Sequence, residues 1–211
     1  MKRHRPATIA AAVLLTFSVS GCATLSALSD AATPLEAYEL RSPSDIPVYP
    51  GRPRPLDVIV ELPTSTGSLA TDRIMIRPNP LQAQYLPEVR WSDPTPVMVQ
   101  NLLLRAVEAT GVARYAGRTP IGPGGDYAIV TELVDFHAEA NTANDTALIR
   151  QSLVVRLVRE RDAAIVTSRR FDAQSPSATL ETQDLITAFD TASDTLLSDF
   201  ANWISRELAR R

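Results

Sequence analysis

Through the middle of the chain, apolar and polar side chains alternate with a period of two, which predicts a sheet. Segment 126–139 is expected to place Tyr127 and Asp135 on one face and Phe136 on the other. After a turn at 141–145, a second long strand is expected to turn one row inward, made of Ala147, Ile149, Gln151, Leu153, Val155 and Leu157. The remaining predicted strands are 38–40, 57–62, 71–77 and 164–171, and the proline in 84–91 makes that segment an edge strand or a loop that crosses an edge. The two long strands and 164–171 are expected to form an antiparallel meander.

Two segments instead repeat their apolar residues every three or four positions, which predicts helices. The first spans about 93–110, with Asp93 as the N-cap, Pro94 at the first helical position and Gly111 as the C-terminal stop. The second spans about 182–210, and its apolar stripe is Leu185, Phe189, Ala192, Leu196, Phe200, Ile204 and Leu208. Asp residues on its polar face favour packing against the sheet over lying on a membrane. We therefore predict an α/β (α+β) fold, a mostly antiparallel sheet of about six or seven strands packed against two main helices.

The N-terminus has a different pattern, with Lys2, Arg3 and Arg5 before an apolar run over 7–19. That run suits a secretory signal and is too short to span a bilayer. It ends in Val-Ser-Gly before Cys22, the only cysteine, and this ending resembles the lipobox of bacterial lipoproteins. The resemblance implies cleavage before Cys22 and covalent attachment of a diacylglycerol and an N-acyl lipid there. The alternative is an ordinary signal peptide that leaves Cys22 as a free thiol.

These features divide the chain into a signal peptide (1–21), a lipidated tether (22–34) and one domain (35–211). In bacterial lipoproteins, aspartate directly after the lipidated cysteine retains the protein at the inner membrane. This chain has Ala23 at that position, so the rule implies sorting to the outer membrane. The full chain has 21 basic and 24 acidic residues, and removal of the signal peptide leaves 18 basic and 24 acidic residues. An acidic domain argues against nucleic acid as a partner.

Little in the sequence indicates catalysis. The domain has one histidine, His137, no metal-ligand spacing and no Gly-x-Ser-x-Gly motif. The glycine-rich run 122–125 lacks the lysine of a phosphate loop and is predicted to be a turn. We therefore predict no catalytic, cofactor or metal site. Four arginines on adjacent strands are expected to pair with acidic residues rather than form a basic patch: Arg150, Arg156, Arg169 and Arg170.

The segment 84–91 carries the strongest candidate contact with a partner protein. Tyr85, Leu86, Val89 and Trp91 lie close together there, and aromatic side chains are frequent in interfaces. For Trp91 itself, the sequence favours burial in the core under the first helix over this contact.

Several motifs occur in a recognisable order behind the lipobox. They are Tyr38-x-Leu40, Leu62-Pro63, the strand 74–77, a tyrosine strand that reaches Trp91, a helix, the strand 127–136 and a closing acidic helix. Together they resemble the ABC-type transport auxiliary lipoprotein family, the PqiC-like lipoproteins.

The resemblance implies a non-catalytic component, anchored in the outer membrane, of an MCE-type (mammalian cell entry) ABC transport system for phospholipids or other hydrophobic molecules. Its partners would be an MCE-domain protein and, through it, an ABC permease and ATPase. Self-association is expected by the same analogy. The alternatives are an outer-membrane assembly lipoprotein resembling LptE, which binds a β-barrel protein, and a lipid-anchored periplasmic enzyme that uses His137.

Overall fold

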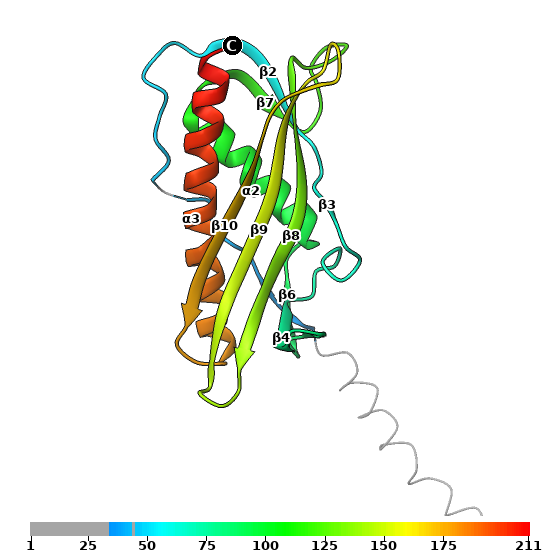
Figure 1. The fold of residues 1–211 in the computed structure, drawn as a ribbon, viewed down its shortest axis with the longest axis vertical. Helices are drawn as coiled ribbons and strands as arrows, with labels where there is room; N and C mark the ends of the chain where they lie inside the picture. The colour runs from blue at the N-terminus through cyan, green and yellow to red at the C-terminus, as the bar shows by residue number, and fades with distance from the viewer. Residues whose placement is uncertain (1–33, 44) are drawn as a thin grey trace, which may run out of the picture. The chain divides into compact units, whose positions relative to one another are not determined.

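A computed structural model describes residues 34–43 and 45–211 (Figure 1). The signal peptide, Cys22 and nearly all of the predicted tether lie outside these residues. The chain divides into two units, 1–35 and 36–211, and the second contains all the helices and strands described here. None of its helices is long and apolar enough to cross a membrane.

An eight-stranded sheet forms the centre of this domain. Its main path runs β10-β9-β8-β2-β7, and β3, β4 and β5 extend it beside β8. The strands are β2 (Arg54–Val60), β3 (Thr64–Ser65), β4 (Met75–Asn79), β5 (Gln82–Tyr85), β7 (Ala113–Gly117), β8 (Tyr127–Asn141), β9 (Thr146–Arg159) and β10 (Ala164–Ser177). A separate parallel pair joins β1 (Glu36–Tyr38) to β6 (Val89–Trp91).

Two helices, α2 (Thr95–Thr110) and α3 (Thr182–Ala209), cover one face of the sheet (Figure 1). The predicted fold class is therefore confirmed. The antiparallel meander is also confirmed, because β8 pairs with β9 and β9 with β10 in antiparallel registers.

The other half of the sheet is mainly parallel, with an antiparallel β4–β5 hairpin at its edge. β2 lies between β7 and β8 and runs parallel to both, and β3 and β4 pair in parallel with β8 further along its edge. The crossover through α2 explains the β2–β7 pair, since parallel neighbours need a long connection. Alternation in the sequence reports which side chains share a face and carries no information about strand direction.

The core lies between the sheet and the helices. Every residue of the predicted inward row of β9 is buried. β8 differs from the prediction, because an irregularity between Leu133 and Asp135 shifts its register against β9. This extra residue reverses the alternation, so that Phe136 is buried in the core and Asp135 is half-exposed.

The ends of α2 agree with the prediction at one end only. Gly111 adopts a left-handed conformation (φ +63°), and its N–H donates to the Glu108 carbonyl. At the start, the carboxylate of Asp93 makes no capping hydrogen bond, and the helix begins at Thr95. The Thr95 hydroxyl donates instead to the Thr71 carbonyl, 2.9 Å away, which fixes the helix to the segment before β4.

Candidate functional site: surfaces for a partner

The four residues predicted as a contact surface do not form one. Leu86, Val89 and Trp91 are buried, and Trp91 packs edge-on against Phe189 of α3, with ring centroids 5.3 Å apart. The segment is not a continuous strand, because β5 and β6 are separated by a turn in which Glu88 has φ +61°. The contact-surface prediction is wrong for these three residues, and the core alternative for Trp91 describes what is found.

Tyr85 alone of the four remains exposed, at 38%. It ends β5, whose four residues are all exposed, and its hydroxyl donates to the Ser68 carbonyl 3.1 Å away. Leu81, in the turn between β4 and β5, is 98% exposed. Of the predicted segment, its first two residues, at the end of the β4–β5 hairpin, thus offer contact area.

His137 lies on the sheet face opposite the helices, yet its side chain is only 4% exposed. Its ring nitrogens are 3.8 Å from the Asp135 carboxylate and 3.6 Å from the Glu139 carboxylate, and neither forms a hydrogen bond within the described residues. The two carboxylates raise the pKa of His137, but burial and the charge of Arg77 lower it by more, so the pKa lies below its usual value. A neutral, enclosed imidazole is poorly placed to reach a substrate.

The arginines on the same face pair with acidic residues, as expected. Arg150 lies 2.7 Å from Glu139, Arg156 lies 3.5 Å from Glu132, and Arg170 lies 2.9 Å from Asp172. Burial alone would raise the pKa of Glu139, but the ion pair with Arg150 holds the pKa below its usual value. Arg169 differs, since its guanidinium lies 4.9 Å from the centre of the Phe171 ring.

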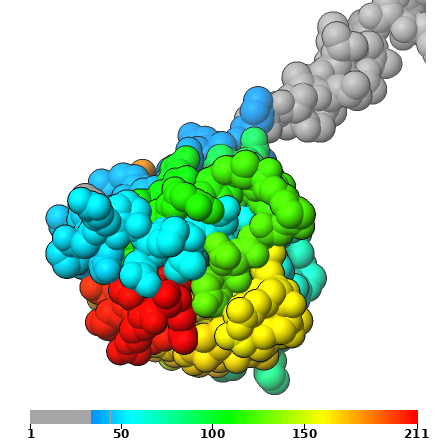
Figure 2. All heavy atoms as spheres, turned by 90° about the horizontal axis from the view of Figure 1, so that it is seen from above, coloured from blue at the N-terminus to red at the C-terminus, as the bar shows by residue number. Residues whose placement is uncertain are grey.

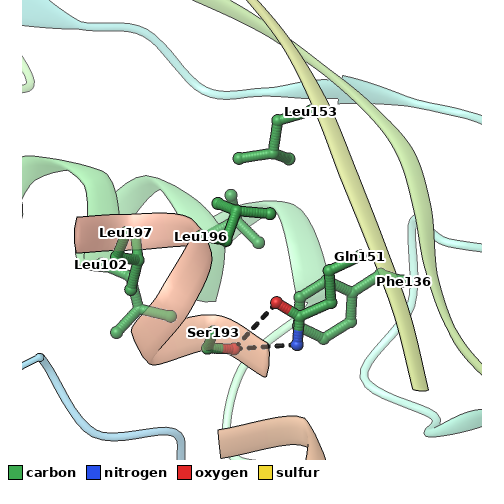
Figure 3. A pocket seen from close by; sticks show the side chains of 8 residues that line it. Leu102, Phe136, Gln151, Leu153, Ser193, Leu196 and Leu197 are labelled. Carbon is green, nitrogen blue, oxygen red and sulfur yellow. Dashed lines mark hydrogen bonds between the residues drawn. The ribbon is translucent and has the colours of Figure 1, made fainter. Parts of the chain in front are cut away.

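The space between the helices and the sheet is closely filled. A cavity of about 10 Å³ lies there, with Leu102, Phe136, Gln151 and Ser193 among its lining residues (Figure 3). That volume holds about one water molecule, whereas pockets for small ligands are typically about 300–1,000 Å³.

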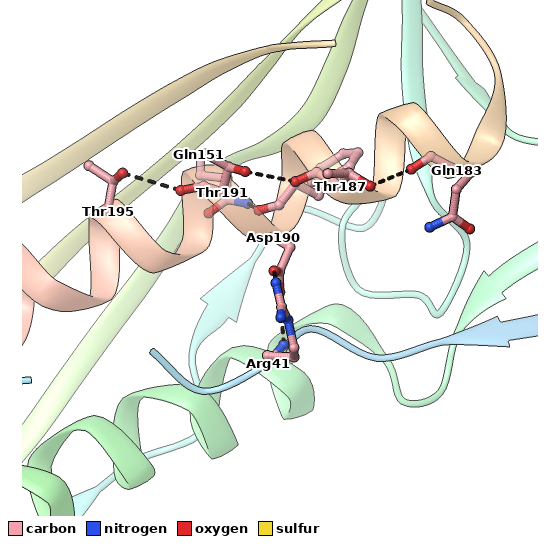
Figure 4. A network of polar contacts seen from close by, with 8 residues as sticks. Arg41, Gln151, Gln183, Thr187, Asp190, Thr191 and Thr195 are labelled. Atoms are coloured by element: carbon pink, nitrogen blue, oxygen red, sulfur yellow. Dashed lines mark hydrogen bonds and ion pairs between the residues drawn. The ribbon is translucent and has the colours of Figure 1, made fainter. Parts of the chain in front are cut away.

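The outer side of α3 is polar. Asp190 accepts hydrogen bonds from both the backbone and the guanidinium of Arg41, and these two residues border a cleft of about 320 Å³ (Figure 4). Along the helix, the hydroxyls of Thr187, Thr191 and Thr195 each donate to the carbonyl four residues earlier. Within residues 34–43 and 45–211, no group of three or more histidine or acidic side chains is arranged to hold a metal ion.

Comparison with known structures defines the class of domain. A DUF330 protein from Xanthomonas campestris (XCC0632) has the same fold, at 21% identity and TM-score 0.70, covering 81% of this chain and 96% of that chain. An uncharacterized protein aligns at 14% identity and TM-score 0.56, covering 78% and 99%. The lipoprotein GNA1162 from Neisseria meningitidis aligns at 11% identity and TM-score 0.39, covering 74% and 100%. The fold is therefore that of the DUF330 structure.

The family follows from the sequence itself. Residues 38–201 match the family described as "ABC-type transport auxiliary lipoprotein component". This chain belongs to the ABC-type transport auxiliary lipoprotein family, as its motifs predicted. No curated protein sequence matches it.

Proposed function

We propose that this chain is a non-catalytic docking component, anchored by lipid on Cys22 to the periplasmic face of the outer membrane, of an MCE-type ABC transport system. It would bind an MCE-domain protein and, through it, an ABC permease and ATPase that move phospholipids or other hydrophobic molecules. Membership of the auxiliary lipoprotein family is the observation that carries this proposal.

Two features of the domain support docking rather than chemistry or carriage of a lipid. The space between helices and sheet, at about 10 Å³, has no room for an acyl chain. His137, the residue on which an enzyme alternative would rely, is enclosed and flanked by Asp135 and Glu139. Both features favour a role carried by the surface of the domain.

The anchor is tested by metabolic labelling with palmitate and by membrane fractionation. Wild type is expected to carry label and to fractionate with the outer membrane, and Cys22→Ala is expected to lose both properties. Label on the Cys22→Ala variant would refute lipidation at this residue. Fractionation of labelled wild type with the inner membrane would refute the proposed location.

The partner is tested by crosslinking in living cells, affinity purification and mass spectrometry, on wild type and Cys22→Ala. We expect wild type to recover an MCE-domain protein, and the variant to recover much less because it is no longer held at the membrane. Recovery of an outer-membrane β-barrel protein without an MCE-domain protein would refute the transport role and favour the assembly-lipoprotein alternative. A role for His137 in catalysis would appear as loss of function in His137→Ala with an unchanged fold.

A further inference from the structure

The domain has two ends of different character. The chain enters it at Glu36, where β1 pairs with β6, and Figure 1 places β6 at the opposite end of the sheet from β2, β7 and the C-terminus. We call the latter the distal end. It consists of residues 48–57, 113–127, 159–165 and 207–211.

Hydrogen bonds join the loops of the distal end to one another. The Glu160 N–H donates to the Asp126 carbonyl (3.1 Å), and the Glu160 carboxylate accepts from the Gly125 N–H (2.6 Å). The Asp126 N–H donates in turn to the Asp57 carbonyl, and the Asp57 N–H donates to the Asp126 carboxylate, both at 2.8 Å. The start of β8, the β9–β10 turn and β2 thus form one connected platform. A surface organised in advance loses little conformational freedom on binding.

Exposed aliphatic side chains project from three separate segments of this end. Val48 is 72% exposed, Ile121 is 75% exposed and Ile165 is 60% exposed. Figure 2 looks onto this end and shows the cyan, green and yellow segments side by side, with the red end of α3 next to the cyan and yellow ones. These side chains supply apolar area at one end of the domain for a partner to bury.

The distal end is also rich in arginine, although the chain as a whole is acidic, with a net charge of −3. It carries eight arginines and five acidic residues. The arginines are Arg52, Arg54, Arg114, Arg118, Arg159, Arg161, Arg210 and Arg211, and the acidic residues are Asp57, Asp126, Glu160, Asp162 and Glu207. The positive excess lies at the end away from the entering chain.

Several of these arginines are not neutralised. Within the described residues, Arg52 and Arg118 form no ion pair, and the guanidinium of Arg118 donates to the uncharged amide oxygen of Asn101. Arg161 is 75% exposed, and its contact with Asp162 is long, at 3.8 Å. These guanidinium groups are free to pair with carboxylates of a partner.

We infer that the distal end is the docking surface for a protein face that carries carboxylates around apolar side chains. Given the proposed function, on which this inference rests, the face belongs to the MCE-domain protein. The position of the distal end in the domain supports the same assignment as its charge. Glu36, where the chain that follows Cys22 enters the domain, lies at the opposite end, so attachment through a lipidated Cys22 leaves the distal end available to a partner. Charge complementarity of this kind accelerates association and selects the partner.

The first test is photocrosslinking in cells that make the full lipidated chain. A benzophenone amino acid replaces Ile121 at the distal end or, as the matched control, Leu81 in the β4–β5 hairpin, since both side chains are highly exposed. We expect an adduct with the MCE-domain protein from position 121 and none from position 81. An adduct from position 81 alone, or an adduct at position 121 only with a second copy of this chain, would overturn the inference.

The second test measures the affinity of the purified full-length lipoprotein for the purified periplasmic part of the MCE-domain protein. Arg118→Glu/Arg161→Glu is compared with Arg90→Glu/Arg105→Glu, which changes the net charge equally but lies outside the distal end. We expect about tenfold weaker binding for the distal pair at low salt, little change for the control pair, and weaker wild-type binding as salt rises. Circular dichroism checks that both variants keep the fold.

The outcomes separate this inference from the proposed function. If wild type binds the MCE-domain protein and both double variants bind equally well, the distal end is not the docking surface and the transport role stands. If wild type neither binds the MCE-domain protein in solution nor crosslinks to it in cells, the transport role fails and the inference fails with it. Loss of binding to phosphatidylglycerol vesicles by the distal variant, with unchanged binding to the MCE-domain protein, would reassign the arginines to a membrane surface.

Discussion

Gln151 is a buried polar residue through which the sheet holds α3, and replacing it tests how the two layers are joined. Its side-chain amide, in the inward row of β9, donates to the Phe189 carbonyl and to the Ser193 hydroxyl, both at 2.9 Å. The Ser193 hydroxyl donates back to the Gln151 carbonyl oxygen at 3.1 Å (Figure 3). Both residues are almost fully buried, so neither side chain is in contact with bulk water.

The expected free energies follow from which polar group each variant leaves unpaired. Ser193→Ala leaves the buried Gln151 oxygen without its donor, which costs about 1–3 kcal/mol. Gln151→Leu keeps roughly the same volume, and the Ser193 hydroxyl can turn to a carbonyl of its own helix, so we expect a loss of about 1–2 kcal/mol. The double variant leaves neither group unpaired and should lose less than the sum, with a coupling energy of about 1–2 kcal/mol.

The assay is urea unfolding of residues 34–211, followed by circular dichroism and by the fluorescence of Trp91 and Trp203. Ser198→Ala is the control, because Ser198 lies on the same helix and its hydroxyl makes no hydrogen bond to the described residues. It should change stability by less than about 0.5 kcal/mol. If the two single losses simply add, to within about 0.5 kcal/mol, Gln151 and Ser193 are not coupled and this account of the helix–sheet junction is wrong.

Three further predictions concern the rest of the domain. Because burial lowers the pKa of His137, the unfolded chain takes up a proton at higher pH than the folded one, so stability should fall with pH below about 6.5, by at most about 1.4 kcal/mol per unit. Urea midpoints at about pH 7 and about pH 5.5 should differ less for His137→Gln than for wild type; an equal difference would refute this. Ala163, in the β9–β10 turn, has φ +54°, so Ala163→Gly should raise stability in thermal unfolding by about 0.5–1 kcal/mol, whereas Ala164→Gly in the strand should lower it. Trp91→Ala should cost about 3–5 kcal/mol in urea unfolding and Tyr85→Ala less than about 1 kcal/mol, and similar losses would contradict the core position of Trp91.

The sequence predicted the parts of the fold that depend on regular alternation over many residues. The inward row of β9 and the apolar stripe of α3 were both found in the core, because each pattern continues for several turns or strand pairs without interruption. The lipobox around Cys22 was equally readable, but it lies outside the described residues and stays a prediction.

What the sequence could not predict depends on single residues or on distant pairing. The irregularity near Val134 follows from the register between β8 and β9, and no local signal distinguishes it from continued alternation. The aromatic run at 84–91 resembled a contact surface because the sequence does not report that Phe136 and Phe189 close over Trp91. The distal end was missed for the same reason, since its arginines come from four segments that only the fold brings to one end.

Two surfaces of the domain combine arginines with aliphatic side chains. The surface whose arginines are not already in ion pairs is the better docking site. On the sheet face away from the helices, Arg150 and Arg156 are already held by Glu139 and Glu132, so a partner would have to break existing pairs to use them. At the distal end Arg118 has only an uncharged oxygen as its partner within the described residues, and Arg161 has only a long contact to Asp162. A new carboxylate there adds a pair without removing one, which favours the distal end. Binding through the distal end should therefore weaken steeply with salt and with charge reversal at Arg118, whereas binding through the sheet face should respond weakly to both.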